Sequence, residues 1–276
     1  MKSIAFGQYY AAESAIHRLD ARTKVLLAIL YIVATFLCKS LISFGVLLFS
    51  AFLLIAVSRI PFKVILRSLK AIFFIMLFTV AINIFWTQGE RLLFEWKFIK
   101  IYVEGIYNAV FMAVRIMVLI AGTGLFLTYT TTPIQLTDAI ERLLKPLKKI
   151  KVPVHEFAMM MTIALRFVPT LVDETDKIMS AQKARGADFT NGSLIKRVKA
   201  LLPILIPLFV SSFRRAEELA TAMECRCYHG GDGRTKMTVT RMRISDATAL
   251  VLMIAFGALI LLINVFAVKH GLGYSM

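Results

Sequence analysis

Two arginines occur in matching sequence frames, and a guanidinium in this setting is suited to binding a carboxylate of another protein. The first frame is Ala-Gln-Lys-Ala-Arg-Gly at residues 181–186, and the second is Ala-Met-Glu-Cys-Arg-Cys at residues 222–227. Arg185 and Arg226 thus lie 41 residues apart in the same local context. Arginine keeps its charge and binds carboxylates through a planar, two-pronged group, which lysine lacks. The repetition predicts two similar helical prongs on one chain.

Both frames fall at the ends of predicted helices. A helix that follows Pro153 ends at Gly186, a residue type that suits the left-handed position past a helix C-terminus. The next helix ends before the glycine-rich segment at residues 230–233. An arginine at such an end is favoured by the helix dipole and can serve only to satisfy the last carbonyls. The shared frame reduces the weight of this structural alternative and leaves it open.

Other chemistry finds less support in the sequence. Cys225, Cys227 and His229 are close together, but they lack a fourth ligand for a tetrahedral metal site. The sequence contains no Gly-x-x-x-x-Gly-Lys-Ser/Thr phosphate loop, and His155-Glu156 is not followed by the second histidine of a zinc protease. We therefore expect no metal, no cofactor and no catalytic activity on this chain.

The composition requires lipid as the solvent for much of the chain. Of the 276 residues, 58% are hydrophobic and 21 are phenylalanine, which is more than a soluble domain of this size buries. A spanning helix needs about 20 apolar residues, and its backbone must be hydrogen-bonded internally. Uncharged stretches near that length cover residues 25–38, 40–58, 71–89, 116–137 and 247–268. The sequence predicts an all-α integral membrane protein with about five transmembrane helices.

Lysine and arginine set the expected orientation, because they concentrate on the cytoplasmic side of membrane proteins. They are frequent in the N-terminal arm and between the second and third spans. These basic residues are Lys2, Arg18, Arg22, Lys24, Arg59, Lys63, Arg67 and Lys70. We therefore expect four spans in residues 1–128, a cytoplasmic helical region at residues 129–243, and a last span with a short external tail at residues 244–276. The net charge of +16 fits this rule, and we expect no nucleic-acid partner.

Arg115 is the one strongly ionisable residue deep in a predicted span, where a charge costs about 2.5 to 3.5 kcal/mol. Asn83 is a candidate neighbour. Glu104 lies on the same helical face but on the order of 16 Å along the axis, too far for direct pairing. We expect Arg115 to be a structural anchor within the membrane.

The cytoplasmic region begins with an amphipathic helix. Thr132, Pro133 and Gln135 have the spacing of a capping box with proline at the first helical position. Apolar residues then share one face, and charged residues line the other. The apolar set is Ile140, Leu143, Leu144 and Leu147. Such a helix can lie on a membrane surface or pack on a neighbouring helix.

Several motifs together resemble the transmembrane T component of energy-coupling factor (ECF) transporters, the EcfT/CbiQ family. They are Ala-Glu-Ser-Ala-Ile-His-Arg-Leu-Asp-Ala-Arg-Thr-Lys at residues 12–24, Leu-Arg-Phe-Val-Pro at residues 165–169, and the two arginine frames. The resemblance implies a membrane scaffold with a cytoplasmic coupling domain that docks on two ATP-binding-cassette ATPases. The docking residues it implies are Ala184, Arg185, Gly186, Cys225, Arg226 and Cys227. The second motif departs from the usual pattern, since cysteines replace both the alanine and the glycine.

The resemblance also implies a second partner, a small integral-membrane S component that captures a vitamin or a metal ion. Residues whose apolar faces would suit that contact are Ile140, Leu143, Leu144, Leu147, Ala164, Val168 and Leu171. ATP hydrolysis would occur on the partner ATPases, and the assembly would be a multi-pass importer in a prokaryotic cell membrane. Two alternatives remain open from the residues alone. One is a self-contained permease that binds its substrate near Arg115, and the other is a membrane-embedded enzyme.

Overall fold

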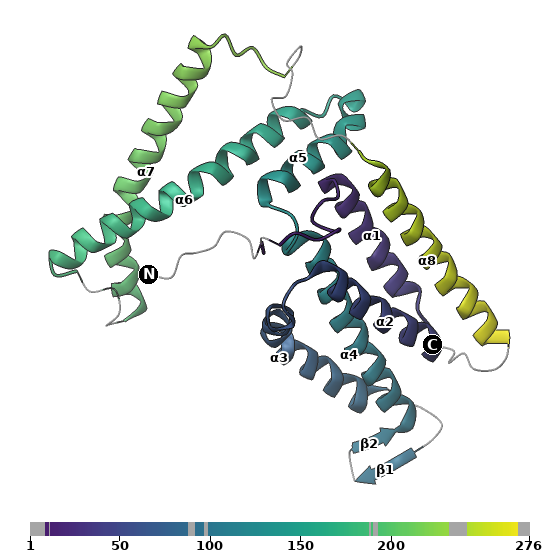
Figure 1. The fold of residues 1–276 in the computed structure, drawn as a ribbon. Coiled ribbons are helices and arrows are strands. Elements are labelled where there is room, and N and C mark those ends of the chain that lie inside the picture. The colour runs from purple at the N-terminus through teal and green to yellow at the C-terminus, as the bar shows by residue number, and fades with distance from the viewer. Residues whose placement is uncertain are drawn as a thin grey trace. The chain divides into compact units, whose positions relative to one another are not determined.

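The computed structural model describes residues 9–10, 12–87, 92–96, 99–187, 189, 193–231 and 242–269, and nearly all of them are helical (Figure 1). The predicted class, an all-α membrane protein, is confirmed. The chain divides into two compact units. One, the membrane unit, comprises residues 1–139 and 240–276, and the other, the coupling unit, comprises residues 140–239.

The membrane unit is a bundle of apolar helices. In chain order these are α1 (Ala21–Leu37), α2 (Leu41–Ser58), α3 (Phe62–Trp86), α4 (Val103–Thr123) and α8 (Ile244–Lys269). A single π-helical turn, η1 (Gly124–Thr128), continues α4. A short antiparallel pair, β1 (Leu92–Trp96) with β2 (Ile99–Tyr102), connects α3 to α4. Helix α1 packs against α4 and α8, and α2 also contacts both.

Four segments in the described residues are long and apolar enough to cross a membrane: α2, α3, α4 with η1, and α8. The remaining predicted span, α1, is a helix of 17 residues. The fourth span differs from the predicted stretch at residues 116–137, since it runs from Val103 to Thr128. Its first turn admits Glu104, and a turn precedes the new helix that begins at Pro133. A hydropathy pattern alone predicts neither the start of this span at Val103 nor its end at Thr128.

A buried amide joins three of these helices at one end of the bundle. Asn264 on α8 accepts a hydrogen bond from the Ser43 hydroxyl at 2.6 Å and one from the Lys39 amide at 3.3 Å. Its own NH₂ group donates to the Leu37 carbonyl at 2.6 Å. Inside a bilayer the free carbonyls at a helix end have no water to pair with, so this amide satisfies the end of α1.

Helix α5 (Pro133–Leu144) begins at the predicted capping box. The Thr132 amide donates to the Gln135 side chain at 3.2 Å, and the Gln135 amide donates to the Thr132 hydroxyl at 3.3 Å. The amphipathic pattern predicts that this helix continues to Leu147, but it ends at Leu144. A 3₁₀ segment, η2 (Lys145–Ile150), takes over at the last turn, because Pro146 has no amide to donate and its ring crowds the preceding turn.

The coupling unit is dominated by two long helices, α6 (Val154–Ala184) and α7 (Leu194–Cys225), drawn in teal and green in Figure 1. Pro169 lies inside α6, and Pro203 and Pro207 lie inside α7, without ending either helix. The two helices pack against each other. An ion pair between Glu174 of α6 and Arg215 of α7 joins them.

Candidate docking site

The C-terminus of α6 places Arg185 at the helix cap. Gly186 follows in the left-handed conformation, with φ of +86°. Its amide donates to the Lys183 carbonyl at 3.0 Å, and the Ala187 amide donates to the Gln182 carbonyl at 3.0 Å. This pair of bonds is the Schellman motif, which closes a helix by turning its last carbonyls back onto the following amides.

The C-terminus of α7 repeats this geometry around Arg226. Cys227 takes the place of the glycine, with φ of +55°. Its amide donates to the Glu224 carbonyl at 2.8 Å, and the Tyr228 amide donates to the Met223 carbonyl at 3.0 Å. The cysteine substitution in the second motif therefore preserves the cap. A side chain in this conformation costs roughly 1 kcal/mol or more.

These caps bear on the structural alternative for the two arginines. The two backbone amides after each arginine already engage two carbonyls in the last turn of its helix, which reduces the need for the guanidinium there. Arg185 and Arg226 are both exposed. Within the residues that the structure describes, no hydrogen bond or ion pair engages either guanidinium. Each charge is therefore available to a carboxylate on another molecule.

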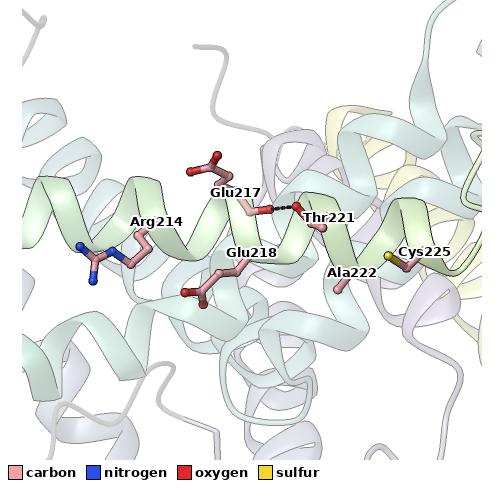
Figure 2. Close-up of a pocket in the computed structure, with 6 residues that line it drawn as sticks. All are labelled: Arg214, Glu217, Glu218, Thr221, Ala222 and Cys225. Atoms are coloured by element: carbon pink, nitrogen blue, oxygen red, sulfur yellow. Dashed lines mark hydrogen bonds between the residues drawn. The ribbon is translucent and has the colours of Figure 1, made fainter.

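The remaining predicted docking residues surround these two charges. Ala184 and Gly186 are exposed beside Arg185, and Cys225 and Cys227 are exposed beside Arg226. An open hollow of about 450 Å³ leads along α7 toward the second tip, and Figure 2 shows that one helix supplies its whole lining. The lining residues are Arg214, Glu217, Glu218, Thr221, Ala222 and Cys225. The hollow is a charged surface feature next to the arginine.

The predicted S-component contact residues lie on α5, η2 and α6. Ile140 and Leu144 of α5 are exposed, and Leu143 between them is half-buried. Leu147 is also exposed but belongs to η2, where the side chains no longer follow the spacing of α5. The three predicted on α6 are Ala164, which is exposed, and Val168 and Leu171, which are half-buried.

The sequence prediction omitted a larger apolar surface on α7. Between Lys199 and Arg214 the helix carries no charge, and several of its large apolar side chains are exposed. These include Leu202, Leu205, Ile206, Phe209, Val210 and Phe213. The uncharged run with basic residues at both ends is the signal that identifies it, although its length falls short of a membrane span.

Arg115 contacts the end of α1, not either neighbour considered from the sequence, Glu104 or Asn83. Its guanidinium donates to the Cys38 carbonyl at 2.9 Å and lies 5.3 Å from the centre of the Phe44 ring. The C-terminus of a helix carries partial negative charge, which favours a cation there. This arrangement is consistent with the predicted structural anchor.

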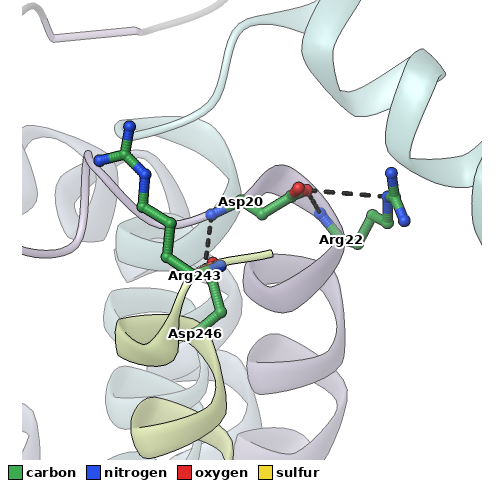
Figure 3. Close-up of polar contacts among 4 residues, drawn as sticks. All are labelled: Asp20, Arg22, Arg243 and Asp246. Carbon is green, nitrogen blue, oxygen red and sulfur yellow. Dashed lines mark hydrogen bonds and ion pairs between the residues drawn. The ribbon is translucent and has the colours of Figure 1, made fainter. Parts of the chain in front are cut away.

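The motif at residues 12–24 joins the start of α1 to the start of α8, a role that sequence reasoning did not assign. Asp246 is buried, and its carboxylate accepts from the Asp20 amide at 2.8 Å and from the Arg243 amide at 2.7 Å. Asp20 in turn caps α1 by accepting from the Arg22 amide at 3.0 Å. Figure 3 shows these contacts in one cluster.

Lys24 extends the same cluster to the end of η1. Its ammonium is buried and donates to the Thr130 carbonyl at 2.7 Å and to the His17 carbonyl at 3.1 Å. Thr130 lies shortly before the start of α5, and Arg243 directly precedes α8. The motif therefore contacts the chain just ahead of both helices.

The fold and the site define a multi-pass membrane protein that presents two exposed arginines on a pair of long helices. The family model CbiQ, described as "Cobalt transport protein", matches residues 12–239. A relative from Clostridium kluyveri is 54% identical over 90% of this chain and 92% of its own length, and one from Acidaminococcus fermentans is 52% identical over 93% and 95%. A relative from Bacillus subtilis is 46% identical over 94% and 98%.

Each of these relatives is named energy-coupling factor transporter transmembrane protein EcfT. At this identity and coverage the chain belongs to the EcfT/CbiQ family, as the motifs predict.

Proposed function

We propose that this chain is the transmembrane energy-coupling subunit of an ECF-type importer and that Arg185 and Arg226 dock it onto two ATP-binding-cassette ATPases. The observation that carries the proposal is the pair of equivalent helix caps, each with an exposed arginine whose guanidinium makes no hydrogen bond or ion pair among the described residues. Two like sites on one chain suit two like subunits. The charge of each arginine suits a carboxylate in a groove of the ATPase.

The proposed orientation places the N-terminus and residues 129–243 in the cytoplasm, where the ATPases find ATP. The density of lysine and arginine in the N-terminal arm and before α3 supports this side. Residues 1–128 and 244–276 then form the membrane scaffold, which contacts the lipid bilayer. Exposed phenylalanines on α3, among them Phe73, Phe74 and Phe78, suit contact with acyl chains.

In this mechanism the chain has no catalytic step of its own. ATP binding and hydrolysis move the two ATPases, and α6 and α7 transmit that motion from their tips. An S component in the membrane receives it through the apolar faces of α5, α6 and α7. The S component holds the cargo, a vitamin or another micronutrient, so cargo specificity resides on another polypeptide. The Arg115 guanidinium donates to the Cys38 carbonyl and lies over the Phe44 ring, which supports a structural role for it.

The test is affinity purification from native membranes in mild detergent, followed by mass spectrometry of the bound proteins. Wild type is expected to retain two ATPases and at least one small hydrophobic protein, and Arg185→Ala with Arg226→Ala is expected to lose the ATPases. The matched control is Arg67→Ala with Arg197→Ala, exposed arginines of α3 and α7 that lie away from both C-terminal caps. A chain that purifies alone and binds a ligand by itself would instead favour the self-contained permease.

A further inference from the structure

The ion pair between α6 and α7 joins equivalent positions of the two helices. Glu174 and Arg215 are 41 residues apart, and the two docking arginines have the same offset. Each member of the pair therefore lies eleven residues before the arginine of its own helix. The helices cross at the same distance from both tips.

The two segments beyond this crossing have the properties of rigid arms of equal length. At 1.5 Å per residue, eleven residues of helix span about 16 Å. Neither arm contains proline or glycine before its arginine. The prolines inside the helices, Pro169 in α6 and Pro203 and Pro207 in α7, lie on the other side of the crossing. Any bending at these prolines therefore leaves the arms themselves straight.

Burial is matched at several equivalent positions along the two arms. At the crossing the side chains of Glu174 and Arg215 are 22% and 32% exposed. One turn further, the equivalent residues Ile178 and Leu219 are both half-buried. Near the tips the equivalent residues Ala184 and Cys225 are both exposed.

We propose that Glu174 and Arg215 are positioning residues that set the separation of the two docking arginines. Two helices in contact at one point can change their crossing angle, and packing preferences restrict that angle only loosely. A charged hydrogen bond at the contact adds a directional constraint. With arms of about 16 Å, each 10° of change moves the tips relative to each other by roughly 3 Å.

The inference rests on the proposed function for its consequence, the match to two ATPases, but its geometry can be measured on the chain alone. Spin labels are placed at Ser180→Cys and Thr221→Cys, which are exposed and occupy equivalent positions on the two arms. The native cysteines are replaced by Cys38→Ala, Cys225→Ala and Cys227→Gly. Pulsed electron resonance then gives the distance distribution between the arms for the full chain in lipid nanodiscs.

We expect Glu174→Arg and Arg215→Glu each to broaden the distribution or shift its mean by about 3 Å or more, because like charges then face each other. The double exchange, Glu174→Arg with Arg215→Glu, is expected to restore the original distribution. Glu218→Arg and Arg214→Glu make the same charge changes at exposed neighbouring positions and are expected to leave it unchanged. Unchanged distances in both single variants, or no recovery in the double exchange, would overturn the proposal.

The experiment still tests the ion pair if a single variant fails to fold. If a single reversal cannot be purified, recovery of a folded chain with the original distances in the double exchange supports the pair, and continued failure contradicts it. ATPase retention is measured separately on the same variants. If the distances respond as expected while Arg185→Ala with Arg226→Ala still retains the ATPases, the proposed function fails and the positioning pair stands.

Discussion

The membrane unit and the coupling unit use their polar and apolar residues in opposite ways. In the membrane unit, buried polar groups such as Asp246, Lys24 and Asn264 find partners far away in the sequence. In the described part of the coupling unit only Ala158 and Ile204 are buried, whereas large side chains such as Phe209 are exposed. The described core therefore lies almost entirely in the membrane unit, whereas the coupling unit is largely exposed.

This difference determines what a substitution is expected to change. In the membrane unit, removal of a buried partner leaves a polar group without a hydrogen bond, and stability falls. In the coupling unit, removal of an exposed group leaves the isolated chain intact, and association with partners falls.

The largest effect is expected for the double variant Arg185→Ala with Arg226→Ala, measured as uptake by the reconstituted importer. Each arginine at the centre of an interface contributes about 2 kcal/mol or more, so the loss of both reduces uptake at least a hundredfold. The thermal unfolding midpoint of the isolated chain is expected to stay within error of wild type. A lowered midpoint would show that the arginines stabilise the chain itself, contrary to the comparison.

The second effect concerns Asp246→Ala, which removes the acceptor of two backbone amides. We expect a loss of about 2 to 4 kcal/mol in stability, because the amides of Asp20 and Arg243 then lack a charged partner. The measurement is thermal or denaturant unfolding in detergent. The matched control is Asp173→Ala on α6, an exposed carboxylate, for which a change below about 0.5 kcal/mol is expected. Equal effects at the two aspartates would contradict the contrast between the units.

A smaller effect is expected for Asn264→Leu in the membrane unit. Hydrogen bonds between membrane helices contribute about 0.6 kcal/mol on average and about 1.7 at most, and this amide makes several. We expect a loss of about 1 to 2 kcal/mol, measured by the same unfolding experiment. Leu262→Ala on the same helix alters an exposed side chain and is expected to cost much less. A neutral Asn264→Leu would show that the buried amide does not help to hold α8 to α1 and α2.

The smallest effect is expected at the second cap. There, replacing cysteine by glycine is expected to change the stability of the end of α7 in opposite directions at two nearby sites. Cys227→Gly relieves a side chain from the left-handed conformation and is expected to stabilise the end of α7 by about 1 kcal/mol. Cys225→Gly places glycine inside the helix and is expected to destabilise it by up to about 1 kcal/mol. Hydrogen exchange of the last helical turn measures both, as protection changed about fivefold in opposite directions. A lower protection in Cys227→Gly would contradict the cap geometry.

Local signals accounted for the parts of the fold that depend on neighbours in the sequence. The capping box at Thr132 and Gln135 forms as predicted, and Gly186 takes the left-handed conformation that its position predicts. The predicted extension of α5 to Leu147 is wrong. The apolar spacing continues past residue 144, but Pro146 cannot continue the α-helix. Where a strong local signal and a periodic pattern disagree, the backbone chemistry of proline decides.

Partners distant in the sequence could not be predicted in the same way. The sequence offered Asn83 as a candidate neighbour of Arg115, but the guanidinium donates to the backbone carbonyl of Cys38. A carbonyl carries no sequence signature, since every residue has one. The role of the motif at residues 12–24 was hidden for a related reason, because Asp20 and Asp246 are separated by 226 residues.

By itself, the amino-acid sequence determined the membrane class, the family and the positions of the two arginine frames, since hydropathy, helix caps and repeated frames each occupy short segments of the chain. Only the tertiary structure decided that the two caps share one geometry despite their different residues, and that Glu174 meets Arg215 at equal distance from both tips. Such pairings depend on where whole helices cross, and a helix crossing is set by the packing of many side chains at once.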